Sequence, residues 1–252
     1  MPFFNIAKNS PISALEKEFQ KLPKEGKLYR HPASNLVIEH KGDLGCIYGQ
    51  EKYWSKLADL TKSHTAPESV KLLDIGAYIG DSVWYFLVNR KITNNVISVE
   101  PDPRNIELFQ KNWEGDKRVE LIQAAVVGDN RKTVNLYLGR TYSGANTLQP
   151  LKGRKYIEVP AIHYLELFDR NPQILKGVMA GAEYQIDWKK LPDSVQTIGL
   201  EISHIHSSWI ELGRKLDQDL LNMGFHHVVA PKHRPTHFAE WNYSIWTRLK
   251  EH

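Results

Sequence analysis

One segment constrains the fold more than any other. It is an apolar run at residues 71–75 that leads directly into a turn with glycines at positions 76 and 80. A second apolar run, residues 96–99, ends at Glu100, twenty residues after the second glycine. Short apolar runs bounded by turn signals are typical of strands buried in a parallel sheet. Because glycine adopts positive φ angles and lets the backbone approach a ligand closely, the pattern predicts a strand, a tight turn, a helix and a second strand whose terminal acid lies beside the turn.

The rest of the chain alternates between apolar strand-like runs and helical segments. Such alternation predicts an α/β fold with a mostly parallel sheet covered by helices on both faces. The last two strands have a hairpin-like relation, which predicts an antiparallel edge strand. The predicted strands are 70–76, 95–101, 119–127, 133–139, 155–161, 173–179, 195–203, 225–230 and 242–249, and the predicted helices are 81–90, 103–113, 163–169, 182–190 and 207–223.

The N-terminal part has a different pattern. We predict an amphipathic helix at residues 11–22, a hairpin over 35–49 around Lys41-Gly42-Asp43, and a helix over 50–61. This predicts a helical and hairpin extension at residues 1–65, followed by the α/β domain at 66–252.

Composition excludes several classes of protein. A chain of 252 residues with 41% hydrophobic residues supports one sizeable core. The formal net charge of +4 permits nucleic-acid binding without favouring it, and the single cysteine, Cys46, allows no internal disulfide. No apolar run reaches the length of a membrane span, and the N-terminus lacks a signal-peptide pattern, so we expect a cytoplasmic protein without membrane association.

The glycine turn and the acid together predict a site for an adenosine-containing ligand. An acid at the tip of the second strand can accept hydrogen bonds from both hydroxyls of a ribose, and the glycine turn can pass close under the same ligand. The turn has the pattern Asp-x-Gly-x-x-x-Gly, starting at Asp74. It lacks the Gly-x-Gly-x-x-Gly fingerprint of dinucleotide-binding proteins, which disfavours an NAD-dependent dehydrogenase.

The arrangement resembles motif I of the class I S-adenosylmethionine-dependent methyltransferases, and more narrowly the FkbM-type methyltransferases. The resemblance covers about residues 70–230 and rests on residues 74–80, 99–101, 124–127, 143–148 and 175–183. It implies a Rossmann-like class I methyltransferase sheet with S-adenosyl-L-methionine as the cofactor. The cofactor-binding residues that it indicates are Asp74, Gly76, Ala77, Tyr78, Gly80, Asp81, Ser82, Glu100, Pro101, Gln123 and Ala124. We also expect Asp81 and Ser82 to cap the helix that follows the turn.

Two departures from the family pattern bear on function. Tyr78 stands where the family usually has Asn, and a bulky Tyr adopts left-handed backbone poorly. Either the turn is right-handed here, or Tyr78 stacks on the cofactor. Val178 and Ala180 stand where the family has acids, so only Glu183 of that acidic set remains.

The chemistry needs a base if the acceptor is an alcohol. Our catalytic candidates are His204, which follows a predicted strand, and Glu183. The family resemblance implies O-methylation of a sugar or another polar small molecule. The alternatives are a cofactor-binding relative without catalytic activity and a nucleic-acid methyltransferase, the latter favoured by the pI near 8.9.

His204 and His206 form a His-x-His pair, yet no acid-rich partner segment accompanies them, so we predict no metal site. The oligomeric state stays open.

Overall fold

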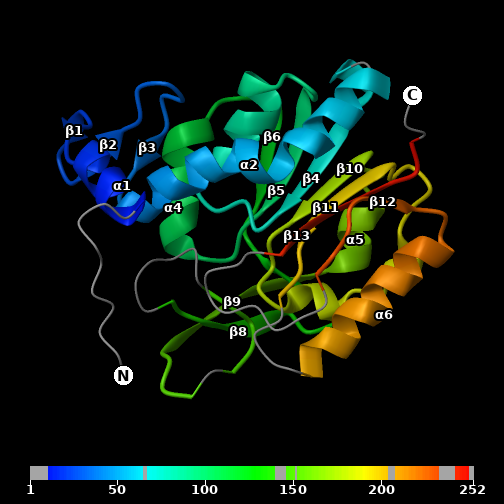
Figure 1. Ribbon diagram of the computed structural model, residues 1–252. Coiled ribbons are helices and arrows are strands. Elements are labelled where there is room, and N and C mark those ends of the chain that lie inside the picture. Colours follow the sequence, from blue (N-terminus) through cyan, green and yellow to red (C-terminus); the bar gives the residue numbers. More distant parts are fainter. Residues whose placement is uncertain are drawn as a thin grey trace.

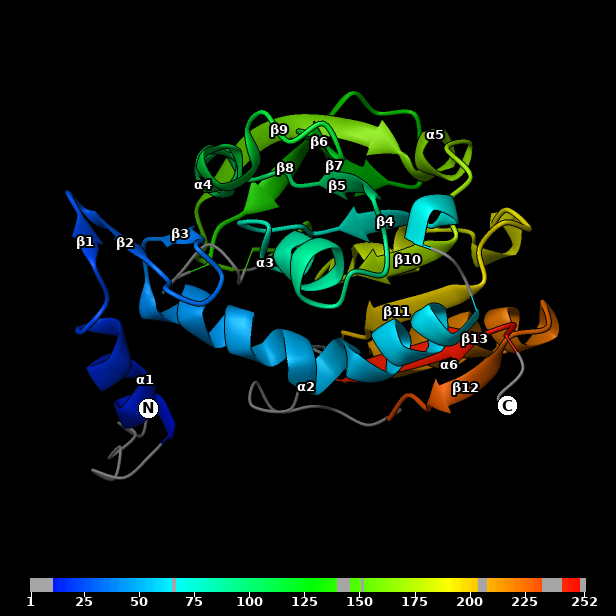
Figure 2. The ribbon, with the colours of Figure 1, turned by 90° about the horizontal axis from the view of Figure 1, so that it is seen from above.

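A seven-stranded sheet forms the centre of the molecule (Figure 1). The computed structural model describes residues 11–64, 67–139, 146–150, 152–203, 208–232 and 242–249. The strand order is β12-β13-β11-β10-β4-β5-β6, and the strands follow one another in this order in Figure 2. Their bounds are β4 (Lys71–Ile75), β5 (Asn95–Val99), β6 (Val119–Ile122), β10 (Ile174–Gly177), β11 (Thr197–Glu201), β12 (His226–Val229) and β13 (Tyr243–Thr247).

The pairing confirms the mostly parallel sheet and its antiparallel edge. β11, β10, β4, β5 and β6 pair in parallel, each with the next in this order. β13 pairs antiparallel with both β11 and β12. The last two strands therefore form the antiparallel edge that the sequence predicts, with β12 outermost and β13 between β12 and β11.

Helices cover both faces of the sheet. One face carries α2 (Lys41–His64), α3 (Asp81–Val83), the π-helix η2 (Trp84–Asn89) and α4 (Pro103–Trp113), and the other carries α5 (Tyr164–Phe168) and α6 (Ser208–Asn222). Successive residues of a strand point to opposite faces. Accordingly Leu72 packs in one cluster with Trp54 of α2 and Phe86 of η2, whereas Leu73 packs in another with Leu216 of α6. No helix in the described ranges is long and apolar enough to cross a membrane.

A smaller sheet follows β6. It contains β7 (Ala125–Val127), β8 (Thr133–Tyr137) and β9 (Tyr156–His163) in the order β7-β9-β8. The strand predicted over 119–127 is therefore two strands, because the chain leaves the large sheet at Gln123 and Ala124 and joins the small one. β8 pairs antiparallel with β9 over five residue pairs, as the two predicted short strands require.

The N-terminal prediction is wrong over 35–49. The sequence there forms β3 (Val37–Ile38), which pairs with β2 (Leu28–Arg30), and then the first turns of α2. β2 also pairs with β1 (Lys24–Glu25), and α1 (Pro11–Phe19) precedes them. The glycines at 42, 45 and 49 suggested turns, but burial of Leu44 and Ile47 on one side of a helix overrides their weak helix propensity.

Two other predicted helices are irregular. The segment at 182–190 forms two short 3₁₀ helices, η4 (Ala182–Gln185) and η5 (Trp188–Lys190), and η1 (Pro67–Ser69) is a third. The segment at 81–90 has only one α-helical turn before its π-helical part. The division into an extension and a domain stays a prediction. Trp54 and Leu57 of α2 are nevertheless buried in the same cluster as Leu72 and Val96 of the sheet.

Candidate active site

The glycine turn follows β4, between the ends of β5 and β10. Gly76 has φ +74°, and its N–H donates to the Val99 carbonyl at 2.9 Å. A Cβ atom at this position would lie 2.0 Å from the Val178 carbonyl oxygen. At Gly80, with φ +84°, a Cβ would lie 2.2 Å from the indole nitrogen of Trp113. Packing within the protein therefore requires both glycines.

Tyr78 adopts the left-handed conformation, with φ +53°. The first of our two alternatives, a right-handed turn, is thus wrong. A non-glycine residue in this region costs on the order of 1–2 kcal/mol. Two contacts hold it there: its N–H donates to Glu100 Oε2 at 2.9 Å, and its hydroxyl donates to Asp43 near the start of α2. Helix α2 is thereby attached to the turn, and the phenol oxygen is already bonded within the protein.

Glu100 lies at the end of β5, where the sequence places it, and is 5% exposed. Its carboxylate accepts three N–H groups: those of the Tyr78 and Asp102 backbones, each at 2.9 Å, and the Asn105 amide at 3.0 Å. Burial raises the pKa of Glu100 to about 7. A carboxylate offers about four acceptor positions, so roughly one remains for a further donor.

A buried ion pair lies under the turn. The Lys176 ammonium, from β10, is 2.8 Å from Asp74 Oδ1 and donates to the Gly76 carbonyl at 3.1 Å. Ser82 donates to Asp74 Oδ2, and neither side chain is exposed. Sequence reasoning passed over Lys176. The signal that could have found it is a lysine inside the apolar strand at residues 174–177, because a lysine is almost never fully buried without a partner.

The expected helix caps are not formed. The N-cap position of α3 is Gly80, which has no side chain, and no side-chain cap bond is present. Ser82 is engaged by Asp74, and Asp81 accepts from the Gln50 amide of α2 at 2.7 Å. Burial raises the pKa of Asp81 to about 6. Both polar side chains therefore join the turn to the interior of the protein.

Glu183 is fully buried where η4 begins. Its Oε2 accepts the Gly181 N–H at 2.7 Å, and its Oε1 accepts the Ser203 N–H at 2.8 Å. Burial raises the pKa of its carboxyl group. The side chain thus connects the loops after β10 and β11. Of the remaining candidates, Ala77 and Ala124 are buried, Pro101 is partly exposed and Gln123 is exposed.

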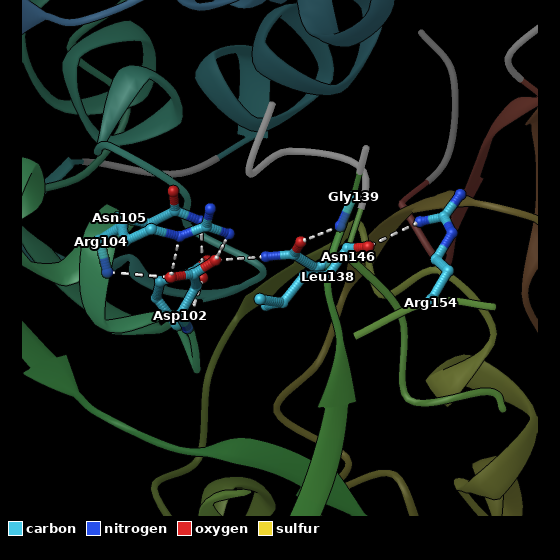
Figure 3. Close-up of polar contacts among 8 residues, drawn as sticks. Asp102, Arg104, Asn105, Leu138, Gly139, Asn146 and Arg154 are labelled. Atoms are coloured by element: carbon cyan, nitrogen blue, oxygen red, sulfur yellow. Dashed lines mark hydrogen bonds and ion pairs between the residues drawn. The ribbon is translucent and has the colours of Figure 1, made fainter. Parts of the chain in front are cut away.

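Asn146 and Thr147 bridge the loops on either side of β4, and Figure 3 shows the contacts of Asn146 with Asp102 and Gly139. The Asn146 amide donates to Asp102 Oδ2 at 2.5 Å, and its oxygen accepts the Gly139 N–H at 2.7 Å. Thr147 donates to the Ala180 carbonyl at 2.6 Å. Asp102 follows β5 and Ala180 follows β10, so the segment that leaves β8 is attached to both neighbours of the glycine turn. We used residues 143–148 only as part of the family resemblance and did not predict this role.

Several of the histidines lie outside the described residues, among them His204, His206, His233 and His237. His227 lies 2.6 Å from Asp217 of α6 through its Nε2 atom. Within the described ranges, no group of His, Cys, Asp and Glu side chains has a geometry that could hold a metal ion.

Comparison with known families decides the classification. The sequence model of the methyltransferase FkbM domain family matches residues 74–226, which is more than half of the chain. This part contains the glycine turn, Glu100 and Glu183. This chain belongs to the FkbM methyltransferase family. It is an S-adenosylmethionine-dependent methyltransferase with a Rossmann-like sheet, and S-adenosylmethionine is its cofactor.

Solved structures are similar at low identity. The FkbM methyltransferase of Methylobacillus flagellatus KT is 13% identical with a TM-score of 0.46, over 94% of this chain and 58% of that one. The precorrin-6y C5,15-methyltransferase of Geobacter metallireducens GS-15 is 13% identical with a TM-score of 0.41, over 75% and 84%. M. capricolum TrmK, solved with S-adenosylhomocysteine, is 11% identical with a TM-score of 0.40, over 77% and 68%. No curated protein matches the sequence significantly.

The cofactor fits the residues at the turn. Glu100 keeps about one acceptor position beside the turn at residues 76–80, which is the chemistry that a ribose hydroxyl requires. The space where glycine Cβ atoms would lie is filled by Val178 and Trp113, so the glycines shape the turn and do not themselves open a cavity.

The packing at Gly80 predicts a stability loss. Gly80→Ala should lower the free energy of unfolding by about 2–4 kcal/mol, because the new methyl group meets Trp113 and the backbone has a positive φ. Gly115→Ala is the matched control, with φ +86° and no atom within 4 Å of the Cβ position, and should cost only about 1–2 kcal/mol. Urea denaturation measures both. Equal losses would show that Trp113 moves aside freely.

Burial of Glu201 predicts a pH dependence of stability. The residue is 7% exposed, its Oε2 has no hydrogen-bond partner among the described residues, and burial together with the Glu183 charge raises its pKa from 4.5 to about 8. The folded state then keeps a proton that the unfolded state releases above about pH 4.5. Wild-type stability should therefore fall from about pH 5 to 8, relative to Glu201→Gln, by on the order of 1–3 kcal/mol. Denaturation at several pH values tests this, and parallel curves would contradict it.

Proposed function

We propose that the protein transfers the methyl group of S-adenosylmethionine to a hydroxyl oxygen of a sugar or another polar small molecule. The observation that carries the proposal is the hydrogen bond from the Tyr78 N–H to Glu100. It joins the acid that we assign to the ribose hydroxyls to the glycine turn at the carboxyl edge of the sheet. Family membership supplies the reaction class. The mild net charge of +4 permits nucleic acid as the acceptor without favouring it.

The residues divide into two roles in this proposal. Glu100 and the turn backbone at 77–80 bind the cofactor, with Pro101, Gln123 and Ala124 beside them on the same edge. Asp74, Asp81 and Ser82 support the turn from below, since their side chains are bonded to Lys176 and to Gln50 or to one another. The cofactor supplies an activated methyl group with a neutral thioether as leaving group. The chain must hold the acceptor oxygen in line and accept its proton.

We assign proton removal to His204. It follows β11 by three residues, and the imidazole pKa lies near neutrality. Glu183 is the second candidate, but each of its oxygens already accepts a backbone N–H in a fully buried setting. This geometry supports a positioning role, in which Glu183 fixes Ser203, the residue before His204, relative to the loop after β10.

One observation favours an alternative. Val178 and Ala180 replace the acids of the family pattern, as expected for a relative that binds the cofactor without methylating. Turnover on any acceptor separates the two.

Calorimetry tests the cofactor role. The protein should bind S-adenosylmethionine and S-adenosylhomocysteine but not NAD. Glu100→Ala should weaken that binding by about 1–3 kcal/mol, the scale for losing a charged hydrogen-bond acceptor. Glu107→Ala, an exposed carboxylate of the helix that follows β5, is the control and should bind normally. Unchanged affinity in a folded Glu100→Ala protein would remove Glu100 from the ribose role.

Turnover tests the base. With an acceptor in hand, His204→Ala should slow methylation by about 10²–10⁴-fold while cofactor affinity stays the same, because a general base acts only on the acceptor. His206→Ala serves as the control for local disturbance. Equal turnover of His204→Ala and wild type would refute the assignment.

A further inference from the structure

An open groove lies beside the carboxyl edge, between the small sheet and the η4 segment. Its volume is about 710 Å³, within the range of roughly 300–1,000 Å³ typical of small-molecule sites. One wall is the β8–β9 ribbon, and the other comprises residues 148–150 and Gln185. The second wall is attached to the carboxyl edge of the large sheet. Thr147, which precedes this wall, donates to the Ala180 carbonyl, and Gln185 lies two residues after Glu183.

The ribbon presents a polar face to this groove. Thr133, Asn135 and Tyr137 of β8 line the groove together with Val134, whereas Leu136 packs into a small core with Ala125 and Val159. On β9, Glu158 lies directly opposite Asn135. The period of two thus separates a buried apolar face from a face of hydrogen-bonding groups.

Three side-chain amides line the groove. No hydrogen bond in the described part of the chain involves the side-chain amides of Asn135, Gln149 or Gln185, although all three side chains are half-buried at the groove. An amide offers two donors and two acceptor lone pairs, which matches hydroxyl groups that both donate and accept. Such groups favour the binding of a ligand rich in hydroxyls and disfavour one that lacks them, because the amides would then stay unpaired.

An aromatic surface flanks the same face. The Tyr137 and Tyr156 rings are cross-strand partners with centroids 5.6 Å apart, and Tyr156 is 58% exposed. Tyrosine combines an apolar ring face with a polar tip. The C–H faces of a sugar ring can pack on such a surface while its hydroxyls bond sideways.

The charges of the groove oppose an anionic ligand. Its charged lining residues are two acids, Asp129 and Glu158, and one cation, Arg131, which is already bonded to Asp129. A phosphate-bearing ligand would have to displace that pair and face Glu158. Nucleic acids, which bind through phosphate contacts to Lys and Arg, therefore fit poorly.

We propose that this groove binds the acceptor as an uncharged, polyhydroxylated ring of the sugar type, with Asn135, Gln149 and Gln185 as hydrogen-bonding partners and Tyr137 as the stacking surface. This rests on the proposed function and adds the site that selects the substrate. The attachment of residues 146–147 to both sides of the glycine turn places the groove next to the cofactor edge.

The test uses the full chain saturated with S-adenosylhomocysteine, so that no turnover occurs. Methyl α-D-glucopyranoside, methyl α-D-galactopyranoside and methyl α-D-mannopyranoside are the probes, and saturation-transfer NMR followed by titration is the readout. At least one glycoside should bind. Asn135→Ala and Gln149→Ala should each weaken it about 3–10-fold, the scale for one hydrogen bond, while S-adenosylhomocysteine affinity stays unchanged. Gln110→Ala, an exposed amide on α4 far from the groove lining, is the matched control.

The outcomes separate the two proposals. If a glycoside binds equally well to wild type and to both groove variants, the groove is refuted and the sugar acceptor stands. If no glycoside binds while S-adenosylhomocysteine does, the sugar acceptor is refuted and the groove proposal fails with it. An RNA oligonucleotide whose binding is weakened by Asn135→Ala would overturn the uncharged ligand.

Discussion

Lys176 is 3% exposed, and its ammonium lies 2.8 Å from Asp74 and 3.1 Å from the Gly76 carbonyl. The approach to Asp74 Oδ1 is off the hydrogen-bonding direction, so the contact is chiefly electrostatic. Removing one partner of such a buried pair typically costs about 3–5 kcal/mol, because the other charge is left uncompensated. The pair joins β4 to β10 directly beneath the glycine turn. The conformation of the turn therefore depends on a charge supplied a hundred residues further along the chain.

The turn is held from three further directions. Glu100 binds the Tyr78 N–H from β5, Asp43 binds the Tyr78 hydroxyl from α2, and Trp113 donates to the Gly80 carbonyl from α4. Each contact reaches a different element, so the left-handed backbone at Tyr78 is fixed by its surroundings and not by its own preference. The N-terminal elements consequently belong to the construction of the site.

The alternating strands and helices were predictable because burial on both faces gives parallel strands continuous apolar runs. The position of Glu100 was predictable for the same reason, since the end of a buried strand is visible in the sequence. The start of α2 was not, because its glycines signal turns and only tertiary packing of Leu44 and Ile47 makes the segment helical. Nor was the Asp74–Lys176 pair, because no spacing rule connects residues on strands whose adjacency arises from sheet order. The caps expected of Asp81 and Ser82 failed because buried partners, Gln50 and Asp74, compete for the same side chains.

The uncharged side chains of Val178 and Ala180 are consistent with the electrostatics of their surroundings. Three carboxyl groups, those of Asp74, Asp81 and Glu201, already lie near the buried ammonium of Lys176. Burial raises the pKa of Asp81 to about 6 and of Glu201 to about 8, and the neighbouring carboxylates of Asp74 and Glu183 add to these shifts, so further negative charge here would be unfavourable. Acidic residues at positions 178 and 180 would add further negative charge at the same edge of the sheet. An uncharged β10 loop avoids it, and the proton acceptor for an alcohol must then come from outside that loop, which is the reason to look for it in the segment after β11.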